Sequence, residues 1–192
     1  MSDRLYLSCW VRGFSESNML RHFETLVGLF PNSKLALRGP VLRVYALERV
    51  EPPVLEREFL PGADAAEIVS FAAEMARPDC AIEVEAAWDL WQHDGEDWKL
   101  SPAPVTLVCS GPDFDDENGD NLRIEFGLES RFLPIEGLPS SLRMGQSNLR
   151  SLLHLVSQLE TALPLEKRKL WSESGANFAE LLVETLSKFD VN

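Results

Sequence analysis

Apolar residues recur along the chain at two spacings, which indicate two kinds of element. The first segment alternates like a strand with one buried face, with apolar residues at Leu5, Leu7, Cys9 and Val11. The spacing then becomes that of an amphipathic helix over 17–30, with Met19, Leu20, Phe23, Leu26, Val27 and Phe30. Strand character returns over 35–47, and whether 54–59 forms a further short strand stays open.

A second helix and the clearest strand of the chain follow. Asp64 and Glu67 have the spacing of a capping box, and a helix is expected over 64–76. It has to end before Pro78, because the residue before a proline avoids helical angles. Residues 80–91 then alternate strictly, so we expect a strand that buries Ile82, Val84, Trp88 and Leu90 and turns Glu83 and Glu85 to water.

The strand over 80–91 continues into a hairpin. Asp94 and Gly95 are typical of a two-residue turn, which leads into a strand over 98–109 with Leu107 on its buried face. This turn would place Trp91 opposite Trp98. The strand over 98–109 contains Pro102 and Pro104, which lie two residues apart and therefore lack N–H groups on the same edge. We expect that edge of the strand to be unpaired at these two residues.

One more strand and two helices complete the chain. Residues 121–132 alternate, with Ile124 and Phe126 on the buried face and Arg123 and Glu125 facing water. Leucine-rich stripes at helical spacing predict helices over 147–162 and 176–188.

The element order predicts an α+β protein with a mainly antiparallel sheet. If 54–59 is a strand, the N-terminal order is βαββαβ, which resembles the ferredoxin-like arrangement in element order. Two strands would extend that sheet, and two C-terminal helices would cover a face or an end of it. We expect a single domain over 1–192, with the sheet in 1–135 and a helical part in 140–192.

The charge of the chain narrows the range of partners. The 192 residues carry a net charge of −13, which repels nucleic acid and anionic membranes and could attract a basic protein. The start, Met1 to Arg4, does not have the pattern of a signal peptide, and no apolar run is long enough for a membrane span. We therefore expect a cytoplasmic protein of open oligomeric state. Three isolated cysteines are expected to be buried small residues: Cys9, Cys80 and Cys109.

An acidic loop is the most unusual local feature. Its five carboxylates belong to Asp113, Asp115, Asp116, Glu117 and Asp120. A calcium loop of the EF-hand type would place Gly119 at position 6 and Glu125 at position 12, but Phe114 would then occupy the first ligand position. A wide hairpin loop and a recognition surface for a basic partner are the two alternatives. We expect a mobile, solvent-exposed loop that binds no metal specifically, and replacing its four aspartates by asparagine should leave folding stability nearly unchanged. The candidate partner-binding residues of this loop are Asp113, Asp115, Asp116 and Asp120.

The aromatic hairpin is the second candidate. Trp91 and Trp98, ringed by acidic residues such as Asp94, could hold a sugar or a peptide, or could simply stabilise the hairpin as a cross-strand pair.

The sequence contains no pattern that predicts catalysis, a cofactor or a metal. His22, His93 and His154 have no catalytic or metal-binding neighbours in sequence, and no glycine-rich phosphate loop is present. We therefore predict a non-enzymatic cytoplasmic module that binds another protein through an acidic surface, as an inhibitor, an immunity-type protein or an adaptor. The alternative is an enzyme or small-ligand-binding domain whose site is assembled from distant residues.

Overall fold

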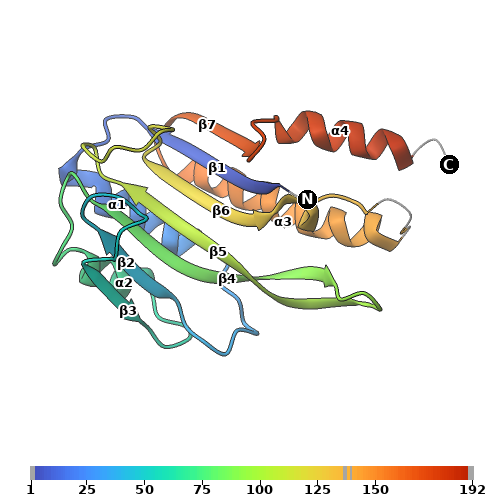
Figure 1. The fold of residues 1–192 in the computed structure, drawn as a ribbon, viewed down its shortest axis with the longest axis horizontal. Coiled ribbons are helices and arrows are strands. Elements are labelled where there is room, and N and C mark those ends of the chain that lie inside the picture. The colour runs from blue at the N-terminus through green and yellow to red at the C-terminus, as the bar shows by residue number, and fades with distance from the viewer. Residues whose placement is uncertain (1–2, 136–137, 139, 190–192) are drawn as a thin grey trace.

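The computed structural model describes residues 3–135, 138 and 140–189, and it contains one seven-stranded antiparallel sheet (Figure 1). The strands are β1 (Arg4–Val11), β2 (Val41–Tyr45), β3 (Leu55–Glu58), β4 (Ala81–His93), β5 (Trp98–Ser110), β6 (Leu122–Leu128) and β7 (Leu165–Ser172). The helices are α1 (Glu16–Leu29), α2 (Ala65–Ala72), α3 (Ser140–Ala162) and α4 (Phe178–Phe189), with a 3₁₀ turn, η1 (Glu129–Arg131). The predicted α+β class with an antiparallel sheet is confirmed.

The sheet order departs from the ferredoxin-like plan, although the first six elements follow the βαββαβ order. The strands lie in the order β3-β2-β4-β5-β6-β1-β7. One split βαβ unit is present, because β3 and β4 flank β2 and are joined through α2. The other unit is spread apart, because β4, β5 and β6 all lie between β1 and β2. The resemblance therefore covers the element order and only half of the strand arrangement.

The C-terminal part contains a strand as well as helices. Residues Leu165–Ser172 form β7, which pairs with β1 at the edge of the sheet. Its centre is charged on both faces, with Glu166, Lys167, Arg168 and Lys169 exposed, so it lacks the apolar alternation of a half-buried strand. Charged edge strands of this kind resist pairing with other chains. Region 140–192 is thus not wholly helical.

The helices cover one face of the sheet unevenly. Helices α1, α2 and α3 lie behind the sheet in Figure 1, whereas α4 contacts β7 and extends past the end of the sheet. Of the two C-terminal helices, α3 lies on the face of the sheet and α4 beside its edge strand β7. No helix in the described ranges has both the length and the apolar content to cross a membrane.

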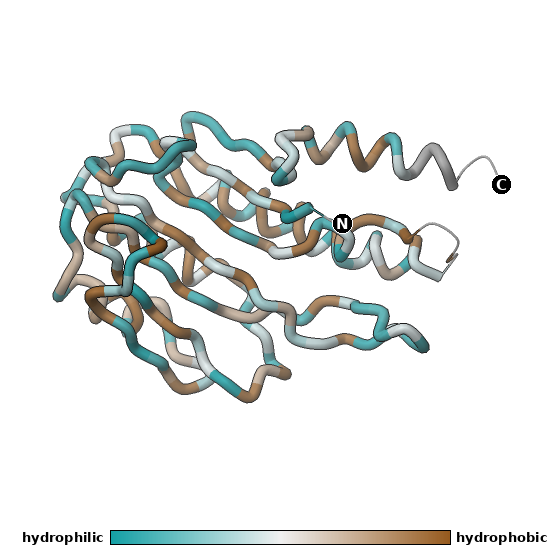
Figure 2. The backbone as a smooth tube through the Cα atoms, viewed as in Figure 1, coloured by the Kyte–Doolittle hydropathy of each residue, from teal (hydrophilic) through white to brown (hydrophobic). Residues whose placement is uncertain are grey.

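The core lies between the sheet and these three helices. Apolar and polar positions alternate along the central strands, as the hydropathy colouring of Figure 2 shows. An aromatic cluster lies at its centre, where the Trp88 ring is 6.0 Å from that of Phe126 and 6.2 Å from that of Phe132. All predicted core residues are buried: Ile82, Val84, Trp88, Leu90, Leu107, Ile124 and Phe126.

The hairpin of β4 and β5 has a different register from the predicted one. His93 lies opposite Trp98 and Trp91 opposite Leu100, so the loop has four residues. The Oδ1 atom of Asp94 accepts hydrogen bonds from the N–H groups of Glu96 and Asp97, and this side-chain turn widens the loop. The register moves by two residues, and the buried faces are therefore unchanged.

The two prolines of β5 lie where no strand hydrogen bond requires their missing N–H groups. Strand β5 pairs with β6 only from Thr106 to Cys109, so the β6 side of β5 is unpaired at Pro102 and Pro104. The predicted unpaired edge is confirmed.

Phe126→Ala tests the packing of the core. Phe126 is fully buried, and its loss should lower the free energy of unfolding by about 3–5 kcal/mol. Urea unfolding measures this change, and Leu37→Ala is the matched control because Leu37 is 95% exposed. An unchanged midpoint for Phe126→Ala would contradict the close packing of this aromatic cluster.

The cysteines supply a second test. All three are free and buried as predicted, and burial raises the pKa of Cys9 to about 12 and raises the pKa values of Cys80 and Cys109 as well. Because the thiolate is the reactive form, the raised pKa and the burial of Cys9 both lower its reactivity near neutral pH. A thiol reagent at pH 8 should label the native protein slowly and the unfolded protein at once. Fast labelling of the native protein would show that the thiols are accessible.

Candidate binding site on the charged face of the sheet

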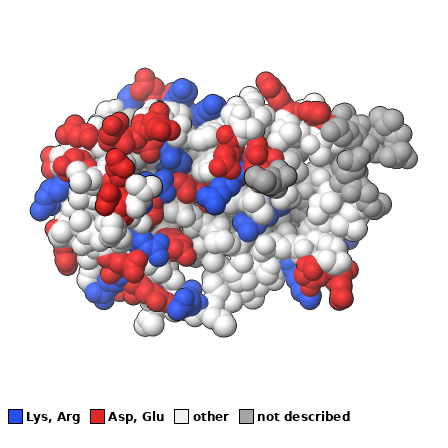
Figure 3. Space-filling model, in the orientation of Figure 1, with Lys and Arg blue, Asp and Glu red and all other residues white. Residues whose placement is uncertain are grey.

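The sheet face opposite α1, α2 and α3 carries two rows of side chains that run across six strands. Strand pairing aligns the first row from β2 to β7 as Arg43, Glu83, Val108, Arg123, Ser8 and Lys169. The second row lies two residues away on each strand and consists of Val41, Glu85, Thr106, Glu125, Tyr6 and Trp171. We call these two rows the charged face; it is turned toward the viewer in Figure 3.

Most ionisable residues at the centre of the charged face are shielded from water. Glu83 and Arg123 are buried and Glu125 is half-buried, so the expectation that they face water was wrong, and only Glu85 is exposed. Two loops cause the difference, since the β2–β3 and β5–β6 connections both place charged side chains against this face. Each buried charge there has a partner of opposite sign, as burial requires.

Arg123 anchors the acidic β5–β6 loop. Its Nε atom lies 2.8 Å from Oδ2 of Asp120 and its Nη2 atom 2.6 Å from Oδ1, which makes a bidentate pair. Its Nη2 atom also donates to Asp116 at 2.5 Å. Burial lowers the pKa of Arg123, but the hydrogen bonds and charges of Asp120 and Asp116 outweigh burial and raise that pKa.

The acidic loop is thus divided into two sets of carboxylates. Asp120 is buried and the Asp116 side chain is only 10% exposed, so the expectation that the whole loop is exposed to solvent was wrong. Asp113, Asp115 and Glu117 are exposed, and no cation of the described residues pairs with them. We call these three residues the acidic rim.

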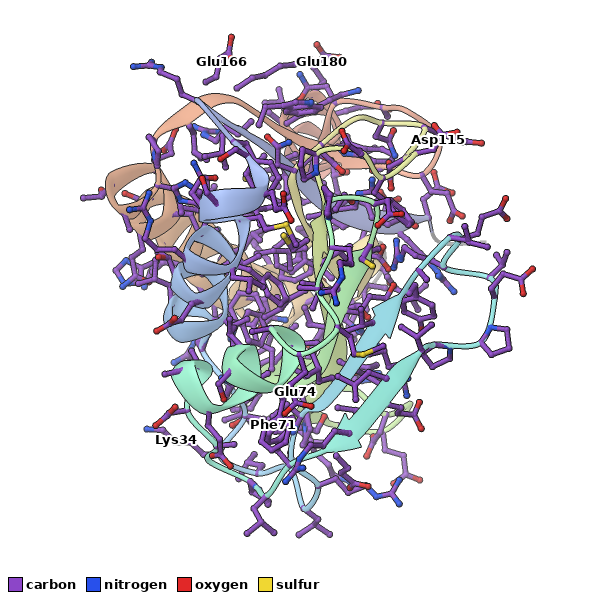
Figure 4. All side chains as sticks on the ribbon, turned by 90° about the vertical axis from the view of Figure 1, so that its left-hand side faces the viewer. Lys34, Phe71, Glu74, Asp115, Glu166 and Glu180 are labelled. Atoms are coloured by element: carbon purple, nitrogen blue, oxygen red, sulfur yellow. The ribbon has the colours of Figure 1, made fainter. Side chains whose placement is uncertain are left out.

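The acidic rim lies on the charged-face side of the molecule. In Figure 4, Asp115 points away from the side occupied by the helices. Acidic side chains gather at the end of the sheet where the β5–β6 loop lies, as Figure 3 shows. The rim therefore presents negative charge without neutralising partners beside the charged face.

Arg49 is the second arginine that spans this face. It belongs to the β2–β3 loop, and its Nη1 atom lies 2.8 Å from Oε1 of Glu125, while its Nε atom donates to Glu83. Burial lowers the pKa of Arg49, and the hydrogen bonds and charges of Glu125 and Glu83 raise it by more. Glu125, which would be the ligand at position 12 of a calcium loop, therefore binds the guanidinium of Arg49 instead.

A shallow groove surrounds Arg49. It has a volume of about 540 Å³ and is lined by Arg4, Tyr6, Arg49, Val50, Glu83, Thr106, Asn118, Arg123, Glu125 and Trp171. The rings of Tyr6 and Trp171 stack with their centroids 4.6 Å apart, and the Trp171 indole donates to Ser8 Oγ at 3.0 Å. Burial, with Glu173 and Glu125 nearby, raises the pKa of Tyr6. The groove thus combines a fixed aromatic surface with two neutralised arginines, Arg49 and Arg123, and one exposed arginine without an ion pair among the described residues, Arg4.

The residues of the predicted hairpin site do not line this groove. Trp98 contacts His93 instead of Trp91, with ring centroids 5.3 Å apart in an edge arrangement, and its indole donates to Ser140 on α3. Asp94 binds Lys99 and the loop N–H groups. Hydrogen bonds of Lys99, Asp97 and Glu96 lower the pKa of Asp94. These contacts account for a stable hairpin without a ligand.

A second, more apolar groove lies beside β4 at the point where its pairing with β2 ends. Its volume is about 710 Å³, and its apolar lining includes Leu35, Ala36, Leu37, Pro40, Ala63, Ala87, Pro102 and Pro104. Its charged residues pair with others of the fold, Arg38 with Glu58 at 3.7 Å and Glu85 with Arg43 at 2.7 Å.

Comparison of the chain with protein-family models, with curated proteins and with solved structures gives no match. The site geometry is therefore the basis for inferring function.

The histidines do not form a common site. His22 is buried on α1, where burial and the charge of Arg21 lower its pKa, and its ring stacks on Phe14 at 6.3 Å. His93 lies at the end of β4 and His154 is exposed on α3. Among the described residues, no group of three or more His, Cys, Asp or Glu side chains is arranged to hold a metal ion.

Asp120→Asn and Asp115→Asn separate the two sets of loop carboxylates. Asp120→Asn leaves Arg123 buried with one charged partner, so the free energy of unfolding should fall by about 3 kcal/mol, the low end for a broken buried pair. Asp115→Asn makes the same chemical change at an exposed site and should alter it by less than about 0.5 kcal/mol. Equal midpoints for the two variants in denaturant unfolding would contradict the anchoring role of Arg123.

Proposed function

We propose that the protein is a non-enzymatic binding module that recognises a basic protein through its acidic rim and charged face. One observation carries the proposal: three exposed carboxylates without cationic partners lie beside a shallow groove in which Arg49 and Arg123 are neutralised by the fold. The field at the acidic rim is therefore negative, and it favours a partner of positive charge.

The two parts of this surface have different tasks in the proposal. The rim carboxylates attract the partner from solution, an effect that salt screens over about 8–10 Å. The stacked Tyr6 and Trp171 supply an aromatic surface of the kind that contributes most to protein interfaces. A shallow, open groove suits a protein surface better than a small substrate, which is held in deeper cavities.

An inhibitor, immunity-type or adaptor role would use this surface in the same way, by covering a basic region of the partner. We place this role in the cytoplasm, since the three cysteines are free and disulfides are rare there.

The apolar groove beside β4 supports a second candidate, the binding of a small apolar ligand. Its volume of about 710 Å³ lies within the usual size range of small-molecule sites. The polar groups of such a site normally converge on the ligand, whereas Arg38 and Glu58 pair with each other and the Arg38 side chain is 88% exposed. Protein binding through the charged face therefore fits the structure better.

The acidic rim can be tested by a charge change with a matched control. The triple variant Asp113→Asn, Asp115→Asn, Glu117→Gln should slow association with a partner captured by the wild type by about tenfold at low salt. It should also flatten the salt dependence of the association rate while leaving the unfolding midpoint unchanged.

The control removes three negative charges elsewhere on the surface, by Glu24→Gln, Glu74→Gln and Glu166→Gln. Surface plasmon resonance over a range of salt concentrations measures both triple variants against the same partner. Equal association rates for the two triple variants would contradict recognition through the acidic rim.

A further inference from the structure

The β2–β3 loop is held against the charged face by one arginine. Its backbone hydrogen bonds stay within the hairpin, from Glu51 N–H to the Glu48 carbonyl and from Val54 N–H to the Val44 carbonyl. Leu47 and Val50 are 74% and 87% exposed, so these apolar side chains of the loop are hardly buried. Ala46 packs against the core where the loop leaves β2, and beyond it the ion pairs of Arg49 join the loop to β4 and β6.

The two carboxylates that receive Arg49 are fixed by the sheet. Glu83 lies on β4 and Glu125 on β6, on either side of β5, with side chains only 10% and 20% exposed. Shielded carboxylates of this kind need a cation, and the planar fork of a guanidinium can bind two of them at once. A rigid receptor for a guanidinium is therefore built into the strands, and its present ligand comes from a loop.

This arrangement differs from the other arginine clusters of the face. Arg43 binds Glu56 and Glu85, and Arg123 binds Asp116 and Asp120, but both arginines are themselves strand residues. Strand pairing fixes their backbones beside these carboxylates. Arg49 can leave by a movement of the loop alone.

We propose that Glu83 and Glu125 form an arginine-binding site, which Arg49 fills in the free protein and an arginine of the partner fills in the complex. This inference rests on the proposed function and specifies the chemistry of the partner. The incoming side chain would find the same two carboxylates, and the groove provides Trp171 and Tyr6 beside it for stacking.

Arg49 then acts as an internal competitor. A ligand on a short tether has an effective concentration in the millimolar range, so Arg49 weakens the binding of any external arginine. A partner has to supply further contacts, such as those with the acidic rim, before its arginine displaces Arg49.

A short peptide tests this site without the partner. The probe is acetyl-Gly-Arg-Gly-amide, and its matched control carries citrulline, which has a similar shape and no charge. We expect Arg49→Ala to bind the arginine peptide at least tenfold more tightly than the wild type, and not to bind the citrulline peptide. Calorimetry and two-dimensional NMR measure the binding and locate the contacted residues.

Further variants test whether the two glutamates hold the peptide. Adding Glu83→Gln and Glu125→Gln to Arg49→Ala should abolish binding of the arginine peptide. If Arg49→Ala does not fold, Arg49→Gln replaces it, since a glutamine can still donate a hydrogen bond to a carboxylate. Equal affinity of the wild type and the Arg49 variant, or binding that survives the loss of both glutamates, would overturn the arginine-binding site.

The two proposals fail separately. A partner that depends on the acidic rim, together with no arginine-peptide binding by the Arg49 variant, would overturn the arginine-binding site and leave the proposed function standing. Peptide binding that requires both glutamates, together with equal partner association for the two triple variants, would support the arginine-binding site and overturn recognition through the rim.

Discussion

The pairing of β6 with both β5 and β1 is the constraint on which the rest of the structure depends. Strand β6 lies between β1 and β5, and it thereby joins β1 and β7 to the other strands in one sheet of seven strands. Its alternation serves both faces at once. Ile124 and Phe126 enter the core, while Arg123 and Glu125 turn to the charged face. A change in its register by one residue would exchange these two sets and would put both charges into the core.

The charges of β6 then determine how the loops fold. A buried arginine without a partner is strongly unfavourable, so Arg123 requires the carboxylates of Asp116 and Asp120. In the same way, Glu83 and Glu125 require the guanidinium of Arg49. The buried charges of the charged face are therefore compensated within it, although the chain as a whole carries −13. The uncompensated charge lies elsewhere, and a part of it is concentrated in the acidic rim.

The sequence predicted those features that apolar alternation specifies. Strands β4 and β6 were found with their buried faces because every second residue is apolar. Strand β7 was missed because an edge strand of charged residues has no apolar period. The hairpin register was missed because it depends on the Asp94 side chain, which competes with the two-residue turn. Strand β7 and the hairpin register both depend on polar residues, which produce no apolar periodicity in the sequence.

The candidate site was harder to predict for the same reason. Two of the four predicted loop residues, Asp113 and Asp115, belong to the exposed rim, and the other two, Asp116 and Asp120, hold Arg123. Arg123 faces away from the apolar core, and alternation alone cannot show whether such a residue meets water or a folded loop. Arg49, Tyr6 and Trp171 carried no pattern at all, since they come together only through sheet order.

The position of an arginine on a strand or on a loop separates structure from binding in this fold. Arg43 and Arg123 are strand residues, so strand pairing fixes their backbones beside their carboxylate partners. Arg49 belongs to a loop with exposed apolar side chains, so its ion pairs can exchange while the sheet stays intact. A partner that offers the same guanidinium would replace one pair by another, and the carboxylates would never be left uncompensated. Exchange of equivalent charges is therefore a route by which a shielded, neutralised face can still bind.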